Sequence, residues 1–208
     1  MSTENKRETM LKVCNKCNES KENGDFYKNR SDCKACRSEY KRKYHRVNWA
    51  KRIVHTSKSN DERARRTSTD LEYVTEQRVK DIAVMQRMAC YYCATVMKVD
   101  VDRRKNPDAV TIERIENTLP HWLENCVLAC SGCNYSRQDT YTFDEFKENF
   151  AQIKTGAIKR CSDCGTIKER SEFYSNKTRK HGVRSICKSC IVARRRMRRA
   201  KKRKLLAQ

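Results

Sequence analysis

Twelve of the thirteen cysteines fall into six pairs in which two residues separate the partners. On a tight turn such a pair spans one edge of a tetrahedral zinc site, and a second pair supplies the opposite edge. One C-x-x-C alone is weak evidence, because redox motifs share it, but six of them with mates indicate metal binding. We expect three structural Zn²⁺ ions, held by Cys14, Cys17, Cys33 and Cys36, by Cys90, Cys93, Cys130 and Cys133, and by Cys161, Cys164, Cys187 and Cys190. The remaining Cys126 is expected as a buried apolar thiol in a strand.

The composition of the chain also favours cross-linking by metal ions. Its 208 residues include only 5 Phe and 2 Trp, and small units with little apolar surface usually need such cross-links. The N-terminal stretch has no apolar signal-peptide core, and no stretch approaches the ~18 apolar residues of a membrane helix. We therefore expect an intracellular, reducing compartment, either cytoplasm or nucleus, and leave a viral origin open.

The charge balance indicates the kind of partner. The chain has 48 Lys and Arg against 26 Asp and Glu, for a net charge of +22. A field of this sign attracts polyanions, above all DNA or RNA. No membrane partner is expected, because the basic runs are not paired with an apolar face. The expected partner is nucleic acid, with double-stranded DNA first, and the oligomeric state stays open.

The two ends of the chain repeat each other. Residues 14–36 and 161–190 each place a Phe-Tyr pair nine residues after the second cysteine, and each ends in C-K-x-C. The second unit has seven extra residues, around positions 180–184. We expect Phe26 and Phe173 to pack on their own zinc units rather than to stack on bases.

A basic, helical run follows each terminal unit, from Arg37 and from Ala193. A zinc site that fixes the start of a basic helix can hold its arginines against phosphates. The alternatives are a solvated helix face or a localisation signal. The expected phosphate contacts are Arg42, Lys43, Arg194, Arg195, Arg196, Arg198 and Arg199.

The middle of the chain reads as a small α+β unit. Apolar spacing predicts a helix over residues 70–88, capped by Thr69 or Asp70, and a second over residues 141–153. Between them we expect strands over residues 110–115 and 125–129 and a helix from Cys130. The expected apolar stripes are Leu71, Val74, Ile82 and Met85 in the first helix and Phe143, Phe146, Phe150 and Ile153 in the second.

These patterns divide the chain into four expected parts. Residues 1–48 form an N-terminal zinc-ribbon-like module with a basic helix, and residues 49–88 a helical linker. Residues 89–155 form the central domain, and residues 156–208 a C-terminal zinc module with a basic tail. The expected fold class is a small, zinc-stabilised α+β protein.

The central segments CYYC, VTIERIEN and HWLENCVLACSGCNYSR resemble the HNH (ββα-metal) endonucleases with a zinc-stapled core. The layout is similar to phage endonuclease VII-like and large-virus HNH proteins, and the terminal units resemble zinc modules that accompany them. The resemblance implies one catalytic Mg²⁺ or Mn²⁺ held by Glu113 and Asn134. It also implies that Asn125 orders the loop and that Arg137 meets the phosphate backbone.

One position departs from this family pattern. Arg114 stands where active relatives carry the general-base histidine, and an arginine cannot give up its proton to activate water. It can still stabilise charge on a phosphate. His121, on the loop before Asn125, is the leading replacement because its ordinary pKa suits a base, and a metal-bound hydroxide is the second option.

The sequence therefore predicts an HNH-type endonuclease that hydrolyses DNA phosphodiester bonds. The alternative is a catalytically silent, zinc-stapled DNA-binding protein with a role in packaging, replication or transcription, and Arg114 favours it. A thiol oxidoreductase is disfavoured, because the paired knuckles are spaced for zinc and no βαβ pattern surrounds them. RNA as the ligand stays open.

Overall fold

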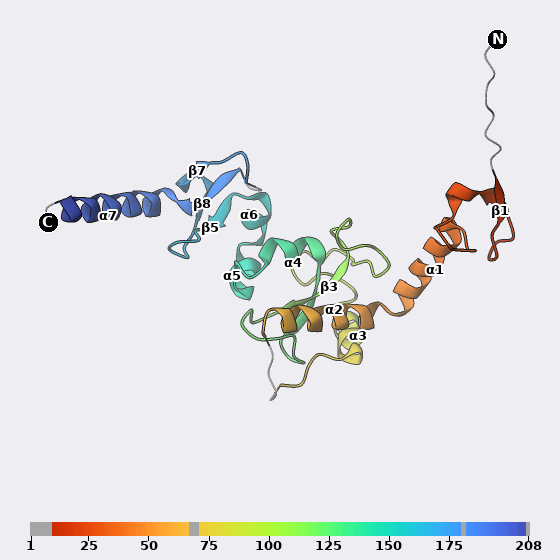
Figure 1. The fold of residues 1–208 in the computed structure, drawn as a ribbon. Helices are drawn as coiled ribbons and strands as arrows, with labels where there is room; N and C mark the ends of the chain where they lie inside the picture. Colours follow the sequence, from red (N-terminus) through yellow and green to blue (C-terminus); the bar gives the residue numbers. More distant parts are fainter. Residues whose placement is uncertain (1–9, 67–70, 180–181, 207–208) are drawn as a thin grey trace, which may run out of the picture.

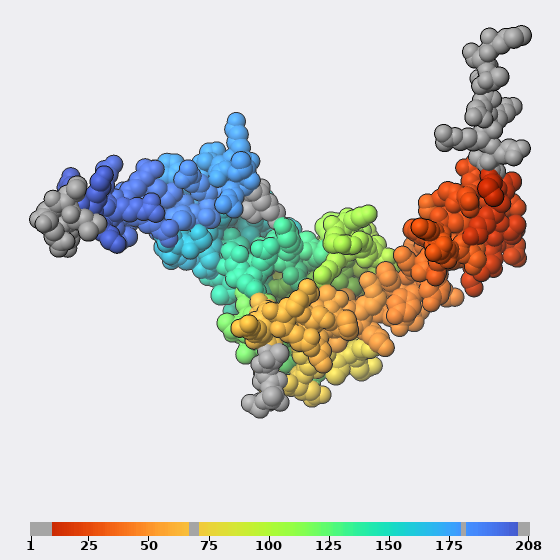
Figure 2. Space-filling view, viewed as in Figure 1, coloured from red at the N-terminus to blue at the C-terminus, as the bar shows by residue number. Residues whose placement is uncertain are grey.

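The computed structural model describes residues 10–66, 71–179 and 182–206. It is a mixed α+β chain in which a central body lies between two small zinc modules. Figure 1 shows that helix α1 leads from the N-terminal module into this body, and that helix α7 extends away on the other side. In the space-filling view the two terminal parts likewise project from opposite sides of the body (Figure 2). In the described parts of the chain, no helix is long and apolar enough to cross a membrane.

The two terminal modules have the same local structure, which confirms the repeat. In the first, strands β1 (Leu11–Val13) and β2 (Ser20–Glu22) pair around a cysteine turn and lead through a short 3₁₀ helix to Phe26. The second repeats this with β5 (Ile158–Arg160), β6 (Ile167–Glu169) and a 3₁₀ helix before Phe173. Both phenylalanines are buried against cysteines of their own module, as predicted.

Each module ends in a long basic helix. In the N-terminal module α1 (Lys34–Val47) starts at Cys33, whose sulfur accepts a hydrogen bond from the N–H of Cys36. In the C-terminal module β7 (Phe173–Ser175) and β8 (Val183–Cys187) pair, and α7 (Lys188–Leu206) follows. The two predicted basic helices are confirmed, and in both modules the second cysteine turn forms the start of the helix.

The central body is built around one antiparallel hairpin. Strands β3 (Val110–Arg114) and β4 (Cys126–Cys130) pair with Ile112 opposite Leu128, and α4 (Ser131–Arg137) follows directly. This confirms the expected order of strand, loop, strand and helix. Cys126 lies in β4 and is buried, as predicted.

Two helices from the segment expected as a linker belong to this core. Helix α2 (Trp49–Arg63) buries Ala50, and α3 (Glu76–Met85) buries Val79 and Ile82. Both pack in the same apolar cluster as the hairpin. The hairpin is therefore packed against a helix, α2, that ends at Arg63, far before β3 begins at Val110.

The first predicted central helix was wrong at its start. Helix α3 begins at Glu76, because Thr75 caps it with a side-chain oxygen that accepts the N–H of Arg78 at 3.1 Å. The expected caps, Thr69 and Asp70, lie outside the described residues.

The predicted stripe of this helix was also partly wrong. Val74 lies before the helix in an extended segment, where its N–H donates to the carbonyl of His121. Met85 is 64% exposed, since Val79, Ile82 and Ala83 form the buried face.

The second predicted helix is broken in two. Helix α5 (Phe143–Glu148) begins with a capping box between Thr142 and Glu145, and α6 (Phe150–Thr155) follows after Asn149. Asn149 leaves helical geometry and so separates them. The apolar stripe nevertheless faces the core as predicted, with Phe146 and Ile153 buried and Phe143 and Phe150 half-buried.

Candidate metal centres and active site

The twelve cysteines predicted as zinc ligands form three groups of four. Within each group the sulfur atoms all lie within 4.8 Å of one another. Four thiolates around zinc, with Zn–S bonds of about 2.3 Å, place their sulfurs about 3.8 Å apart. The Cys14 and Cys36 sulfurs are 4.0 Å apart, and those of Cys93 and Cys130 are 3.8 Å apart. The three groups therefore fit tetrahedral zinc with closed coordination.

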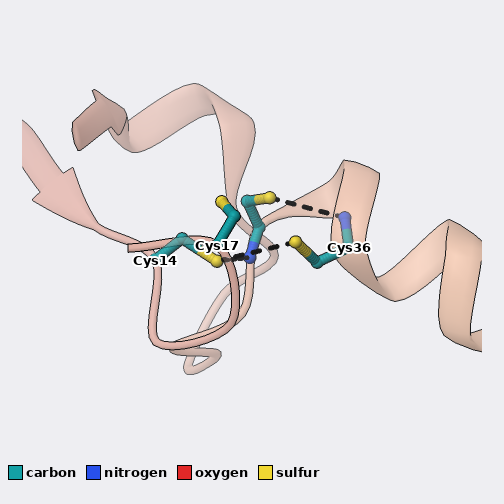
Figure 3. A group of neighbouring side chains, drawn as sticks. Cys14, Cys17 and Cys36 are labelled. Atoms are coloured by element: carbon teal, nitrogen blue, oxygen red, sulfur yellow. Dashed lines mark hydrogen bonds between the residues drawn. The ribbon is translucent and has the colours of Figure 1, made fainter. Parts of the chain in front are cut away.

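Figure 3 shows the N-terminal group, in which Cys14 and Cys17 come from the turn after β1 and Cys36 from the first turn of α1. Backbone N–H groups of Lys16 and Cys33 donate to the Cys14 sulfur at 3.4 and 3.2 Å. Burial alone would raise the pKa of the Cys14 thiol, but hydrogen bonds from the backbone of Cys17, Cys33 and Lys16 lower it to about 6. The turn thus favours the thiolate, which is the form that binds zinc.

The first cysteine turn of each group closes in the same way. The residue after the second cysteine adopts a positive φ, with Asn18 at 56°, Ala94 at 57° and Gly165 at 69°. The N–H of this residue donates to the carbonyl of the first cysteine at 2.9 to 3.0 Å in all three turns. Asn and Gly tolerate this conformation well, whereas the Cβ of an alanine makes it costly.

The central zinc group ties the hairpin to α4. Cys90 and Cys93 lie on a turn beside β4, and the N–H of Tyr91 donates to the carbonyl of Leu128 at 3.0 Å. Cys130 ends β4 and Cys133 lies in α4. The metal would therefore hold the angle between the hairpin and α4, which sets the positions of the candidate active-site residues.

A cleft of about 1180 Å³ runs between α2, the exposed loop over residues 98–107, β3 and α4. Five of the predicted site residues line it, so the fold brings them together from two elements, β3 and α4, and the loop between the strands. They are Glu113, Arg114, His121, Asn134 and Arg137. The exposed side chains of Arg103, Arg104 and Lys105 make its mouth basic.

Glu113 and Arg137 face each other beneath this cleft. Both side chains are buried, and Nη1 of Arg137 forms an ion pair with Oε1 of Glu113. Arg137 also donates to the carbonyls of Arg114 and Ile115 at 2.8 and 3.1 Å. Burial raises the pKa of Glu113 to about 7, and the Arg137 guanidinium opposes that rise.

The burial of Arg137 changes its expected role. It is 1% exposed, so its guanidinium lies inward rather than on the surface that a phosphate contact needs. The reason is that the short helix α4 points this side chain back at the hairpin, where the Glu113 carboxylate and two carbonyls accept hydrogen bonds from its Nη1 and Nη2 atoms.

Asn134 is oriented by β3. Its Nδ2 donates to Thr111 Oγ1 and to the carbonyl of Ile112, both at 3.1 Å. These two bonds fix the amide plane and leave Oδ1 as the oxygen that can accept a further ligand.

Arg114 and Asn125 both organise the loop between the strands. Arg114 donates to the carbonyls of Asn117 and Leu119 at 2.6 and 3.2 Å and pairs with Asp139 at 2.8 Å. Asn125 accepts the N–H of Glu116 at 2.6 Å and donates to the carbonyls of Glu116 and Pro120 at 3.0 Å. Asn125 is buried behind the cleft, where its amide bridges the loop.

His121 has a partner that sequence patterns did not reveal. Its Nδ1 lies 2.6 Å from Oδ2 of Asp61, and its backbone N–H donates to the same oxygen at 2.8 Å. The hydroxyl of Tyr73 donates to this oxygen as well, at 2.9 Å. Burial would raise the pKa of Asp61, but these hydrogen bonds hold it below its usual value. Asp61 is therefore ionised at neutral pH.

Asp61 was missed because nothing local marks it. It lies near the end of α2 in a charged stretch, and 60 residues separate it from His121. Its burial follows from its place on the α2 face that also carries Ala50 and Ser57. The position of Asp61 on that face predicts its burial only weakly, since an aspartate at the end of a helix is ordinarily exposed to solvent.

The expected phosphate-binding side chains of the terminal helices are exposed, in α1 Arg42 and Lys43 and in α7 Arg195, Arg196, Arg198 and Arg199. Arg194 is exposed too but already has a partner: its Nε donates to Oδ2 of Asp163 at 2.9 Å, and a second nitrogen pairs with Oδ1.

No protein-family model matches the chain, and the comparison with curated proteins gives no match. Among solved structures, the chain is similar to PacI, described as a rare-cutting HNH restriction endonuclease, with a TM-score of 0.33 and 16% sequence identity. The similarity covers 70% of this chain and 95% of that chain. A similarity this distant leaves the function to be argued from the residues of the chain itself.

Proposed function

We propose that the central cleft hydrolyses DNA phosphodiester bonds, as an HNH-type endonuclease that uses a divalent metal. The observation that carries this proposal is the Asp61–His121 pair, which faces the same cleft as Asn134 and Glu113. A histidine held by a buried carboxylate, opposite oxygen donors and beneath a basic mouth, has the parts that hydrolysis of a phosphodiester requires.

His121 acts as the general base in this proposal. The Asp61 carboxylate accepts the proton of Nδ1, which leaves Nε2 unprotonated and able to take a proton from water. Asp61 also stabilises the imidazolium that forms when the proton arrives. Arg114 takes no part in proton transfer, because it stays charged and is bound to the loop carbonyls and to Asp139.

Asn134 and Glu113 are the oxygen donors for Mg²⁺ or Mn²⁺. Such ions prefer oxygen ligands, and Oδ1 of Asn134 is the oxygen that its two hydrogen bonds leave available. Glu113 keeps one oxygen, Oε2, outside its ion pair with Arg137. When bound, the metal would neutralise charge on the scissile phosphate and on the leaving oxygen.

The basic surfaces hold the DNA. Exposed arginines and lysines of α1 and α7 and of the loop at the cleft mouth can contact phosphates without reading sequence. The three zinc groups are structural, since four cysteines complete each coordination shell and leave no position for a reactive water.

A second candidate is a DNA-binding protein without catalysis. The observation that favours it is the buried Glu113–Arg137 ion pair, which occupies one oxygen of the only carboxylate proposed as a metal ligand. In this candidate the pair is a structural element that joins β3 to α4.

Nicking of supercoiled plasmid in Mg²⁺ or Mn²⁺ tests the proposal. We expect wild type to nick, and Asn134→Ala and His121→Ala to lose nicking while still binding duplex DNA. Glu113→Gln is preferable to alanine, because it keeps an acceptor for Arg137 while removing the charge. The matched control is His55→Ala, which removes an exposed histidine of α2 and should nick normally. If no protein nicks with either metal while all of them bind duplex DNA equally, the protein is the non-catalytic DNA-binding candidate rather than a nuclease.

A further inference from the structure

The two terminal modules share a zinc scaffold but differ on the face of their basic helices. Counting from the matching cysteines, Lys16 in the first module corresponds to Asp163 in the second. Tyr40 corresponds in the same way to Arg194, and Tyr44 to Arg198. The matching helix faces therefore differ in kind: the face of α1 carries two aromatic rings, and the face of α7 carries arginines in their place.

In the C-terminal module this face is partly closed. Arg194 in α7 makes two contacts with Asp163 on the cysteine turn, so the helix is tied to the knuckle by an ion pair. The neighbouring arginines are exposed and carry no ring among them. Such a surface suits phosphates, which it can contact in a duplex without discrimination between bases.

In the N-terminal module the same face is open and aromatic. Tyr40 is 66% exposed and Tyr44 is 47% exposed, whereas Phe26, which packs on the cysteines of the module, is 7% exposed. Their planes are 24° apart and their centroids are separated by 6.5 Å. The two rings are thus close to parallel and both are exposed, so each offers a face on which a flat ring can stack.

Positive charge lies beside these rings. Tyr40 lines a surface hollow of about 840 Å³ together with Lys16 and Lys43. Asp32 in the same hollow is paired with Arg30 and Arg37, at 3.2 and 3.5 Å. Glu39 also lines the hollow, so its basic side chains outnumber its acidic ones by four to two. A backbone phosphate can lie against the lysines while its base reaches the tyrosines.

We propose that this face, made of Lys16, Tyr40, Lys43 and Tyr44, binds single-stranded nucleic acid by stacking unpaired bases on the two tyrosines. Aromatic platforms flanked by cations bind single strands because every base has a π-face, whereas the bases of a duplex are already stacked on one another. The N-terminal module then prefers single strands, and the C-terminal module supplies contacts to phosphates alone. This inference concerns binding and does not depend on cleavage at the central cleft.

The test measures binding of the full chain to fluorescently labelled oligothymidylate, oligouridylate and a duplex of equal length, at fixed salt and without Mg²⁺. An oligonucleotide of equal length without bases carries the same phosphates and is the probe for charge alone. Tyr40→Leu combined with Tyr44→Leu removes the rings, and the double phenylalanine variant keeps them. Tyr174→Leu, which removes an exposed tyrosine of the other module, is the matched control.

We expect the double leucine variant to bind the single strands about tenfold more weakly and the duplex unchanged. The double phenylalanine variant and Tyr174→Leu should keep wild-type affinity. A double arginine variant, which copies α7 at these positions, should also lose single-strand affinity although it adds two charges. Equal affinity for the DNA and RNA single strands would mean that the tyrosines recognise the bases alone. Tighter binding of one of them would show which kind of single strand the module prefers.

Three results would overturn the inference. The first is an affinity of the double leucine variant for single strands that equals that of wild type. The second is wild-type binding of the base-free strand that is as tight as binding of oligothymidylate. The third is an equal loss of single-strand and duplex binding in the double leucine variant, which would mean that the tyrosines support the module rather than touch bases.

Discussion

Replacing Asp61 by asparagine should weaken His121 as a base, because it removes the negative charge that stabilises the imidazolium. The Asp61 carboxylate accepts hydrogen bonds at one oxygen from Nδ1 and the backbone N–H of His121 and from the Tyr73 hydroxyl, at 2.6, 2.8 and 2.9 Å. An asparagine has the same shape but presents an NH₂ group as well as an oxygen. Because three donors converge on Oδ2, the asparagine oxygen should take that position, so Nδ1 keeps its proton and only the charge is lost.

The expected loss of nicking rate follows from the usual contribution of a general base to catalysis. A positioned general base typically accelerates a reaction by about 10²- to 10⁴-fold, so Asp61→Asn should slow nicking by about 100-fold or more. The variant should still fold, but with a lower free energy of unfolding. Hydrogen bonds to a charged group contribute about 1.5–3 kcal/mol each, and the asparagine keeps only part of this set. We expect the free energy of unfolding to fall by about 2 kcal/mol.

Two measurements check this prediction independently. The nicking rate on supercoiled plasmid reports the base, and the ¹⁵N chemical shifts of the His121 ring report the tautomer without any need for activity. Glu62→Gln is the matched control, because it neutralises the adjacent carboxylate, which is exposed on α2. Wild-type nicking in Asp61→Asn would refute the role given to the Asp61 charge. Wild-type nicking together with a reversed tautomer would also refute His121 as the base.

Four further predictions concern stability, metal content and salt. Ala94→Gly should raise the free energy of unfolding by about 1 kcal/mol in urea titrations, because Ala94 has a φ of 57° that glycine adopts without strain; an unchanged midpoint would contradict this. Glu113 has a pKa of about 7 in the folded chain against 4.5 ordinarily, so its stabilising contribution is present at low pH and is lost as the pH rises through about 7. Urea titrations between about pH 5 and about pH 8 should show that Glu113→Gln removes this decline, and parallel curves for the two proteins would disprove it. Cys126→Ala should leave three zinc ions per chain by metal analysis, because Cys126 lies outside all three cysteine groups, and a stoichiometry of two would reassign it as a ligand. Arg195→Ala with Arg199→Ala should lower the slope of log affinity for duplex DNA against log salt by about 2, and an unchanged slope would remove α7 from the interface.

Packing, rather than the cysteine spacing, determines what the central zinc group does. Cys130 and Cys133 lie at the junction of β4 and α4, so a metal held there fixes the helix that carries Asn134. Removing zinc should therefore disturb the cleft even though no cysteine reaches into it. The terminal groups act locally, since each holds one cysteine turn against the start of one basic helix.

The parts of the molecule that could be predicted from sequence are those set by short-range spacing. The four-cysteine groups follow from residues three positions apart on tight turns, and the terminal repeat follows from matching spacings of cysteine and phenylalanine. The hairpin β3–β4 and helix α4 were predictable as well, since alternation and the position of Cys130 mark them. The start of α3 was not, because Thr75 caps a helix within a stretch whose apolar pattern continues upstream.

The sequence by itself thus determined which cysteines group in fours, as zinc could bind them, which helices are basic and which segments form the central hairpin and helix, since each depends on neighbours along the chain. Only the tertiary structure decided that Arg137 turns inward to Glu113 and that Asp61 meets His121 across 60 residues. Both outcomes depend on which faces of α2 and α4 pack against the hairpin. The physical reason is that a buried charge is stable only beside a partner, and packing chooses that partner from distant parts of the chain.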